Sequence, residues 1–206
     1  LLQGTSATNR AGYAIFTNNW TDYSVEARAS LPSTNAYGWG VSGRLNPVTG
    51  ANYGVFMLPY GAPMAGHPYT WLLTLIKYTG YDVWSGSSLS NSPAVNVGGP
   101  NTNLHALKLT FQGNRIQVQF DGTNVFDQVD GGFEGPPYAS GGIAVGMYTT
   151  TNNYVLSVED VIVRQLGPTA DNQVVVTPLS LATNLVLTGS TSTGTTNFAI
   201  LAPPSN

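Results

Sequence analysis

The sequence predicts an all-β protein, an antiparallel sandwich or barrel built from roughly a dozen short strands. Apolar and polar residues alternate along most segments, whereas helical periodicity is nearly absent. The 206 residues include 24 Gly and 13 Pro, which supply turns at short intervals. Cysteine is absent, so the fold has no disulfide framework and no thiolate metal site.

Several strands can be placed by their alternation. In residues 22–30, one face carries Tyr23, Val25, Ala27 and Ala29. Segments 105–112 and 115–121 alternate in the same way, and Gly113 with its neighbours forms the hairpin turn between them. Residues 121–124, which include Gly122, form the next turn. The other expected strands are, in chain order, 12–16, 37–45, 52–58, 70–78, 142–148 and 154–163. In the last of these the alternation breaks at Glu159-Asp160, which predicts a β-bulge.

The chain divides into a domain at 1–166 and an extension at 167–206, because a Gly-Pro pair interrupts the pattern at 167–168. Residues 172–206 contain no charged side chain, yet they include strand-forming segments. This extension either folds back on its own sandwich, pairs with a neighbouring copy, or begins a further domain. The residues expected to form assembly strands are Val174, Val175, Val176, Leu179, Leu181, Leu185, Leu187, Phe198 and Ile200.

The composition also excludes some classes of binding partner. Only 8% of residues are charged, the formal net charge is −3, and the seven basic residues form no cluster. Binding to nucleic acid through phosphate contacts is therefore not expected. No apolar run is long enough for a membrane-spanning helix. Low charge with abundant Thr, Asn and Gly is typical of secreted or cell-surface proteins, and we interpret the chain as a processed mature form or an excised fragment.

Five segments in order resemble the concanavalin A-like lectin/glucanase superfamily, in particular its laminin G-like branch. The segments are DYSVEARASL, GWGVSGRLNPVTGANYGVFML, NLHALKLTFQGNRIQVQFDG, YASGGIAVGMY and YVLSVEDVIV. In the third, Leu104 replaces the Trp that is usual in that branch. The resemblance implies a jelly-roll sandwich of two curved antiparallel sheets. It also implies sugar binding, protein binding or hydrolysis, among which a fold alone does not decide.

Catalysis is not expected. Glycosidases flank the scissile bond with two carboxylates, and the catalytic branch of this superfamily carries them as E-x-D-x-x-E or E-x-D-x-E, which is missing here. No G-x-S-x-G motif indicates a serine nucleophile. Calcium is a possible cofactor, because the resemblance implies one ion near a loop rim. Its candidate ligands are Asp127, Asp130 and Asp160, and the alternative is a solvated acidic loop.

A sugar site is expected near the strand at 38–45. There Gly40, Ser42 and Arg44 share one face, which would give a shallow floor ending in one fixed donor. The aromatic and polar residues predicted to contact carbohydrate are Arg44, Tyr53, Trp71 and Trp84. The alternative is that the small residues accommodate sheet curvature and the aromatics fill the core.

The leading hypothesis is a non-catalytic extracellular subunit that forms a homopolymeric filament or surface layer by strand addition. The competing hypothesis is a carbohydrate-binding module of a secreted enzyme or adhesin, with a polysaccharide as its partner.

Overall fold

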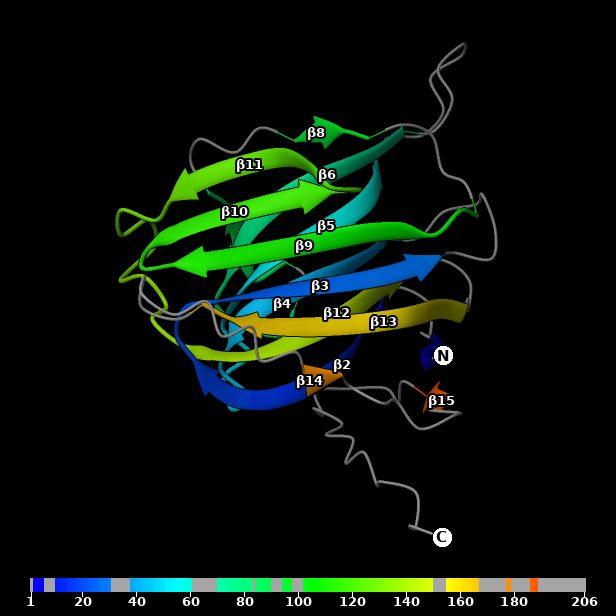
Figure 1. Ribbon diagram of the computed structural model, residues 1–206, viewed down its shortest axis with the longest axis horizontal. Helices are drawn as coiled ribbons and strands as arrows, with labels where there is room; N and C mark the ends of the chain where they lie inside the picture. The colour runs from blue at the N-terminus through cyan, green and yellow to red at the C-terminus, as the bar shows by residue number, and fades with distance from the viewer. Residues whose placement is uncertain are drawn as a thin grey trace, which may run out of the picture.

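The computed structural model describes residues 2–5, 10–30, 38–60, 70–82, 84–89, 94–97, 102–149, 155–166, 177–178 and 186–188. These residues form strands, turns and no helix, so the all-β prediction is confirmed. No described helix is long and apolar enough to cross a membrane. The strands make two sheets, antiparallel except for the β1–β15 pair, that face each other as a jelly-roll sandwich (Figure 1).

Sheet A has the strand order β11-β10-β9-β3-β13-β1-β15, with β14 also paired to β13. Its strands are β1 (Leu2–Thr5), β3 (Tyr23–Ser30), β9 (His105–Gln112), β10 (Arg115–Phe120), β11 (Thr123–Val129), β13 (Val155–Gln165), β14 (Thr177–Pro178) and β15 (Val186–Thr188). In Figure 1 this sheet lies nearest the viewer.

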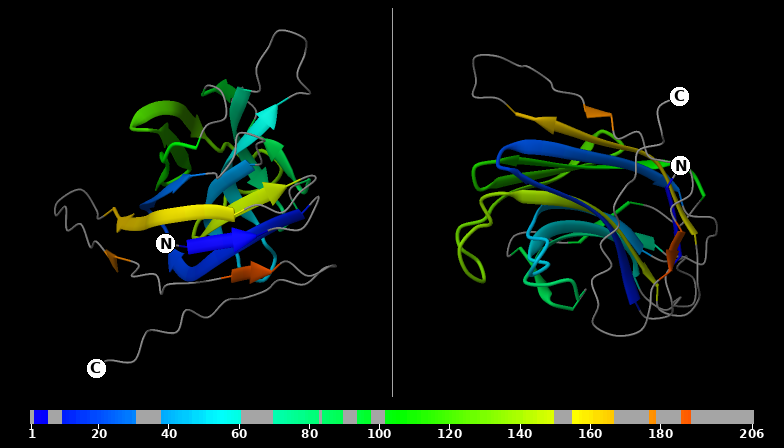
Figure 2. Two further views of the ribbon diagram at one scale, coloured as in Figure 1. Left: turned by 90° about the vertical axis from the view of Figure 1, so that its right-hand side faces the viewer. Right: turned by 90° about the horizontal axis from the view of Figure 1, so that it is seen from below.

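Sheet B has the order β2-β12-β4-β5-β6-β7, with β8 paired to β6. Its strands are β2 (Arg10–Trp20), β4 (Gly38–Leu45), β5 (Asn52–Tyr60), β6 (Thr70–Tyr78), β7 (Gly86–Ser88), β8 (Val95–Asn96) and β12 (Gly141–Thr149). The right-hand view of Figure 2 shows both sheets arched in one direction, with sheet B on the inner side of the arch. The outer surface of sheet B is therefore concave.

The core lies between the sheets and follows the alternation of the sequence. Tyr23, Val25 and Ala27 on β3 are fully buried, as are Val41 on β4 and Val55 on β5. Residues between these positions point to the outer faces of the sheets. The inward face was therefore predictable strand by strand.

Two turns and one bulge that the sequence predicts are present. Gly113 and Gly122 have positive φ values of 54° and 78°, in the hairpin turns on either side of β10. The register between β13 and β3 shifts between Val158 and Asp160, which confirms the bulge at Glu159-Asp160. Because of this bulge, Val161 and Val163 return to the core.

Two short pieces of the extension are described, and both pair with strands of the same chain. Thr177–Pro178 is antiparallel to β13, and Val186–Thr188, which includes Leu187, is parallel to β1. This is the fold-back alternative for those pieces, and no described part of the extension supports the filament hypothesis. The other predicted assembly residues lie outside the described residues: Val174, Val175, Val176, Leu179, Leu181, Leu185, Phe198 and Ile200.

Candidate functional site

The centre of the outer face of sheet B has a floor of small residues covered by aromatic rings. Gly146 on β12 and Gly40 on β4 are paired neighbours, in line with Tyr13 on β2 and Phe56 on β5. A Cβ atom on Gly40 would lie 2.6 Å from the Phe56 ring, and one on Gly146 would lie 2.9 Å from the Tyr13 ring. The two rings therefore rest directly on the backbone of the glycines, which no larger residue would allow.

Four rings continue this arrangement into an aromatic band, which we define as Tyr81, Tyr13, Phe56 and Tyr78. Successive ring centroids are 5.9, 6.4 and 6.1 Å apart. Phe56 and Tyr78 are almost fully buried, whereas Tyr13 and Tyr81 keep part of their surface exposed. The inner two rings thus fix the outer two, and the accessible end of the band is at Tyr13 and Tyr81.

The phenols of the band stay protonated at neutral pH. Burial raises the pKa of Tyr13, Tyr78 and Tyr81, and the nearby Asp82 carboxylate raises that of Tyr13 further. Asp82 and Tyr13 therefore place a carboxylate acceptor and a neutral hydroxyl group close together beside an aromatic surface.

Two buried polar atoms on the same face have no hydrogen-bond partner among the described residues. They are Ser42 Oγ on β4 and Asn52 Oδ1 on β5, and their residues are 1% and 3% exposed. Both atoms lie near the position that a Cβ on Gly54 would take, at 3.0 and 3.3 Å. A buried polar atom without a partner costs about 1–3 kcal/mol, so such a pair calls for a physical explanation.

The turn at 79–85 presents one large aromatic side chain to solvent. Trp84 is 78% exposed. Its backbone NH donates to Asp82 Oδ1 at 2.9 Å, and the Ser85 hydroxyl lies 3.0 and 2.6 Å from the carbonyl oxygens of Gly80 and Asp82. These contacts fix the described residues on both sides of position 83, among them Trp84.

Tyr81 joins this turn to the neighbouring one at 46–50. Its hydroxyl donates to the Pro47 carbonyl at 2.8 Å, and its ring lies against Gly50, where a Cβ would be 2.5 Å away. Asn46 Oδ1 accepts from the backbone NH groups of Val48 and Thr49, and Val48 is 87% exposed. We define the rim as these two turns, 46–50 and 79–85, which border the accessible end of the aromatic band.

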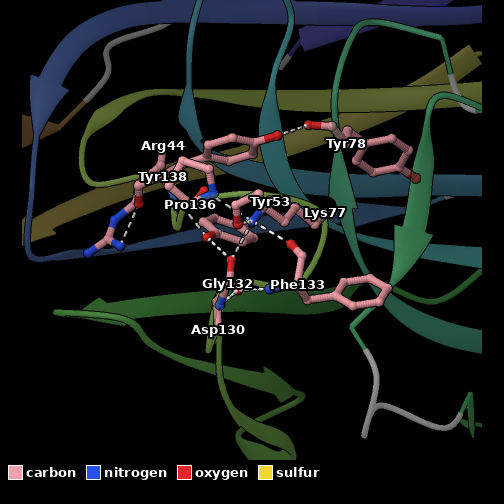
Figure 3. Close-up of polar contacts among 10 residues, drawn as sticks. Arg44, Tyr53, Lys77, Tyr78, Asp130, Gly132, Phe133, Pro136 and Tyr138 are labelled. Carbon is pink, nitrogen blue, oxygen red and sulfur yellow. Dashed lines mark hydrogen bonds and ion pairs between the residues drawn. The ribbon is translucent and has the colours of Figure 1, made fainter.

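A separate cluster of polar groups is buried between the sheets, below the loop 130–140 (Figure 3). Lys77 Nζ and Asp130 Oδ2 are 2.8 Å apart, and both side chains are fully buried. Lys77 also donates to the carbonyls of Phe133, Gly135 and Pro136 at 2.7, 2.8 and 3.1 Å. One ammonium group therefore binds three backbone carbonyl groups of the loop.

Asp130 completes this cluster from the other side. Its Oδ1 accepts from the NH groups of Gly132 and Phe133, and its Oδ2 accepts from the Tyr53 hydroxyl. Burial alone would raise the pKa of Asp130, but the hydrogen bonds from Lys77, Tyr53 and Gly132 lower it below its usual value. Asp130 is thus a stable carboxylate that anchors the loop, and it is poorly suited to act as a proton donor.

The prediction that Arg44 contacts carbohydrate is wrong, because a bulge turns its side chain away from the outer face. Gly142 pairs with Leu45 while Ile143 pairs with Gly43, so Arg44 is skipped, and its φ is +49°. Its side chain is 2% exposed, and its guanidinium donates to the Thr21 and Tyr138 carbonyls at 2.9 and 2.8 Å.

The other three residues predicted to contact carbohydrate lie on different elements of the fold. Tyr53 is fully buried, because alternation along β5 points it inward to Asp130, so the prediction for this residue is also wrong. Trp84 is exposed at the rim. Trp71 lies on β6, but its side chain is outside the described residues.

The three predicted calcium ligands do not come together. Asp127 on β11 bonds Arg115 and Gln117, Asp130 bonds Lys77, and Asp160 on β13 lies 3.4 Å from Arg28. Four strand spacings separate β11 from β13, about 19 Å, which is too far for one ion. Among the described residues no group of three His, Cys, Asp or Glu side chains could hold a metal.

The sequence analysis missed Tyr13, Phe56 and Asn52. Alternation could have found them, since Tyr53, Val55 and Met57 are the apolar inward set of β5 and therefore leave Asn52 and Phe56 outward. Their rings and amide become a site only through glycines on two other strands, β4 and β12. The sequence of a single segment does not predict this cross-strand register.

Neither the known protein-family models nor the curated proteins give a sequence match to this chain. Solved structures do share its fold. A carbohydrate-binding module, CBM66 from Bacillus subtilis, superposes with a TM-score of 0.54 at 12% identity, over 77% of this chain and 84% of the module. The chain has the concanavalin A-like jelly-roll fold.

A second structure, the Crh5 transglycosylase in complex with NAG, gives a TM-score of 0.53 at 13% identity, over 81% of this chain and 73% of the enzyme. These two similarities show the jelly-roll fold that the sequence predicts, and membership in the superfamily and in its laminin G-like branch stays a prediction. Because this fold includes both binding modules and enzymes, the function has to be argued from the site.

Proposed function

We propose that this chain is a secreted, non-catalytic carbohydrate-binding module, which binds through the outer face of sheet B and its rim. The observation that carries the proposal is the exposed Trp84 on a hydrogen-bonded turn, next to the accessible end of the aromatic band. Sugars present apolar CH surfaces and hydroxyl groups together. Flat rings with a few fixed polar groups match both features.

The site has the polar groups that such recognition needs. Asp82 is exposed at its accessible end, and the Tyr13 hydroxyl, Ser42 and Asn52 are buried on the same face. A single exposed apolar residue would need no explanation. Here Trp84 and Val48 are both strongly exposed on two turns that Tyr81 holds together, which favours a binding rim.

The distribution of carboxylates supports the absence of catalysis. The seven strands of sheet B contain no Asp or Glu, whereas glycoside hydrolysis normally needs two. At the rim, Asp82 accepts from the Trp84 NH. Glu134 in the neighbouring loop accepts from the Ser87 hydroxyl at 2.7 Å.

No described feature supports the filament hypothesis as the exposed Trp84 supports carbohydrate binding. Strand addition to a neighbour requires an extension whose backbone is free to pair. The two described pieces already pair with β13 and β1 of their own chain.

Retention by polysaccharides tests the proposal. Native affinity electrophoresis in gels that contain plant, fungal, algal or bacterial polysaccharides should show retardation in at least one gel. Replacing a central aromatic residue typically costs more than 1 kcal/mol, so Trp84→Ala should weaken retention about fivefold or more. The matched control is Val129→Ala, since Val129 is 68% exposed on the edge strand β11 of sheet A.

The control should migrate as the wild type does. The absence of retention in every gel, or equal losses in Trp84→Ala and Val129→Ala, would contradict the proposal. Release of reducing sugar from a retained polysaccharide by the wild type would contradict its non-catalytic part.

A further inference from the structure

Six of the seven Lys and Arg side chains lie away from the proposed binding face. The seven Lys and Arg residues are Arg10, Arg28, Arg44, Lys77, Lys108, Arg115 and Arg164. Four of them, Arg28, Lys108, Arg115 and Arg164, lie on strands of sheet A. The segments outside the described residues contain no Lys or Arg, so this accounting covers the whole sequence.

The two cations on inner strands of sheet B cannot reach a ligand on its outer face. Arg44 is 2% exposed and bonded to backbone carbonyls, and Lys77 is fully buried against Asp130. Only Arg10 remains, at the start of the edge strand β2, and its side chain is outside the described residues.

The charges close to the proposed binding face are negative instead. Asp82 belongs to the rim turn that carries Trp84, and Glu134 contacts Ser87 on β7. A carboxylate or sulfate group placed near Asp82 would meet a like charge with no cation to offset it. Like-charge juxtaposition in an interface costs several kcal/mol, and loss of water from an unpaired anion adds to that cost.

We infer that the site takes neutral polysaccharides and rejects polyanionic ones such as polyuronates and sulfated glycans. This inference rests on the proposed function, because it names the substrate class of the same face. The available polar partners are all suited to hydroxyl groups. Ser42 Oγ can donate or accept, Asn52 Oδ1 and Asp82 accept, and the Tyr13 phenol is neutral.

Salt dependence provides a second, independent consequence. Contacts between a protein cation and an anionic chain weaken as salt screens them, whereas stacking and hydroxyl bonding to a neutral chain change little. Retention of a neutral polysaccharide should therefore change by less than about twofold between about 0.05 and about 0.5 M NaCl.

The experiment compares native affinity electrophoresis on two panels. One holds neutral glucans, mannans, xylans, galactans and fructans, and the other holds alginate, polygalacturonate and chondroitin sulfate. The wild type should be retained by at least one neutral polysaccharide and by no polyanion, at both salt concentrations. Val48→Lys, which adds a cation to the rim, should create salt-sensitive retention by polyanions that the wild type lacks.

The possible failures are distinguishable. Salt-sensitive retention of the wild type by a polyanion would overturn the inference while leaving carbohydrate binding in place. Arg10→Gln would then show whether the one undescribed cation is responsible, and either result would stand against a neutral site. Retention by neither panel would instead contradict the proposed function itself.

Discussion

The outer faces of the two sheets have opposite chemistry although their inner faces follow the same rule. The strands of sheet A carry eight charged residues, namely Glu26, Arg28, Lys108, Arg115, Asp127, Glu159, Asp160 and Arg164. Several of them pair across strands, such as Arg28 with Asp160 and Arg115 with Asp127. Sheet B instead presents aromatic rings on a glycine floor.

This difference shows which part of the sequence determines the fold and which part is available for function. Alternating apolar residues on the inner faces build the sandwich, and they do so equally well in both sheets. Charged side chains on the outer face of sheet A are of the kind that protects β-rich surfaces from aggregation. The outer face of sheet B shows aromatic layering and unpartnered polar atoms, which solubility does not require.

The largest expected effect is on the buried ion pair that anchors the loop below the rim. Lys77→Met removes the partner of Asp130 and the donor to three carbonyls, so it should lower the free energy of unfolding by about 3–5 kcal/mol. Urea denaturation measures this change. Arg28→Met, the matched control on sheet A, should cost less than about 1 kcal/mol, because that pair is half exposed. Similar losses of unfolding free energy in both variants would contradict the stated difference between the buried and the half-exposed ion pair.

The glycine floor gives the next largest effect. Gly40→Ala places a Cβ 2.3 Å from the Val55 carbonyl oxygen and 2.6 Å from the Phe56 ring, so it should cost about 1–3 kcal/mol. Gly131→Ala is the control, because a Cβ at that loop position meets nothing within 4 Å. Thermal unfolding of both variants checks the prediction, and an unchanged melting temperature for Gly40→Ala would show that the band does not rest on this floor.

Acid should weaken the loop anchor. Because the folded-state pKa of Asp130 is lowered, its contribution to stability is fully present above its unfolded pKa, about 3.9, and is lost as pH falls through the folded value. The difference in unfolding free energy between the wild type and Asp130→Asn should therefore be largest near neutral pH and shrink below about pH 4. A difference that stays constant down to about pH 2 would contradict this assignment.

The smallest expected change in stability is at the rim. Trp84→Ala should alter the free energy of unfolding by less than about 0.5 kcal/mol, since this ring is exposed on a turn held by its backbone and by Ser85. A larger loss, measured by urea denaturation, would mean that Trp84 supports the fold and that its effect on binding is indirect.

Much of the fold was predictable because its signals are local. The alternation in β3, the turns at Gly113 and Gly122, and the bulge at Glu159-Asp160 each depend on a few neighbouring residues. Strands β1, β7, β8 and β11 were not predicted. For β7 and β8 the reason is length, since three and two residues are too few for a period to show.

The site was less predictable because it depends on cross-strand register and on distant partners. The residues next to Arg44 in the sequence do not predict the bulge that buries it. The groups that Arg44 contacts or lies beside are on β12 and in the segment before β3. Likewise, the sequence alone favours an exposed side chain for Lys77, a charged residue within an apolar strand. Its burial depends on Asp130, which is 53 positions later in the sequence. Trp84 is exposed on a turn that local hydrogen bonds hold, and its contact with carbohydrate stays a prediction.

The most direct test of the central claim is an amide and indole NMR titration of the ¹⁵N-labelled chain with a neutral oligosaccharide from a polysaccharide that retains it. The account predicts chemical-shift changes that cluster at the Trp84 indole, the rim turns 46–50 and 79–85, and the central residues of β2, β4 and β5. Amides of β9, β10 and β11 on sheet A should stay unchanged. Changes centred on those sheet A strands, with none at the Trp84 indole, would contradict the account.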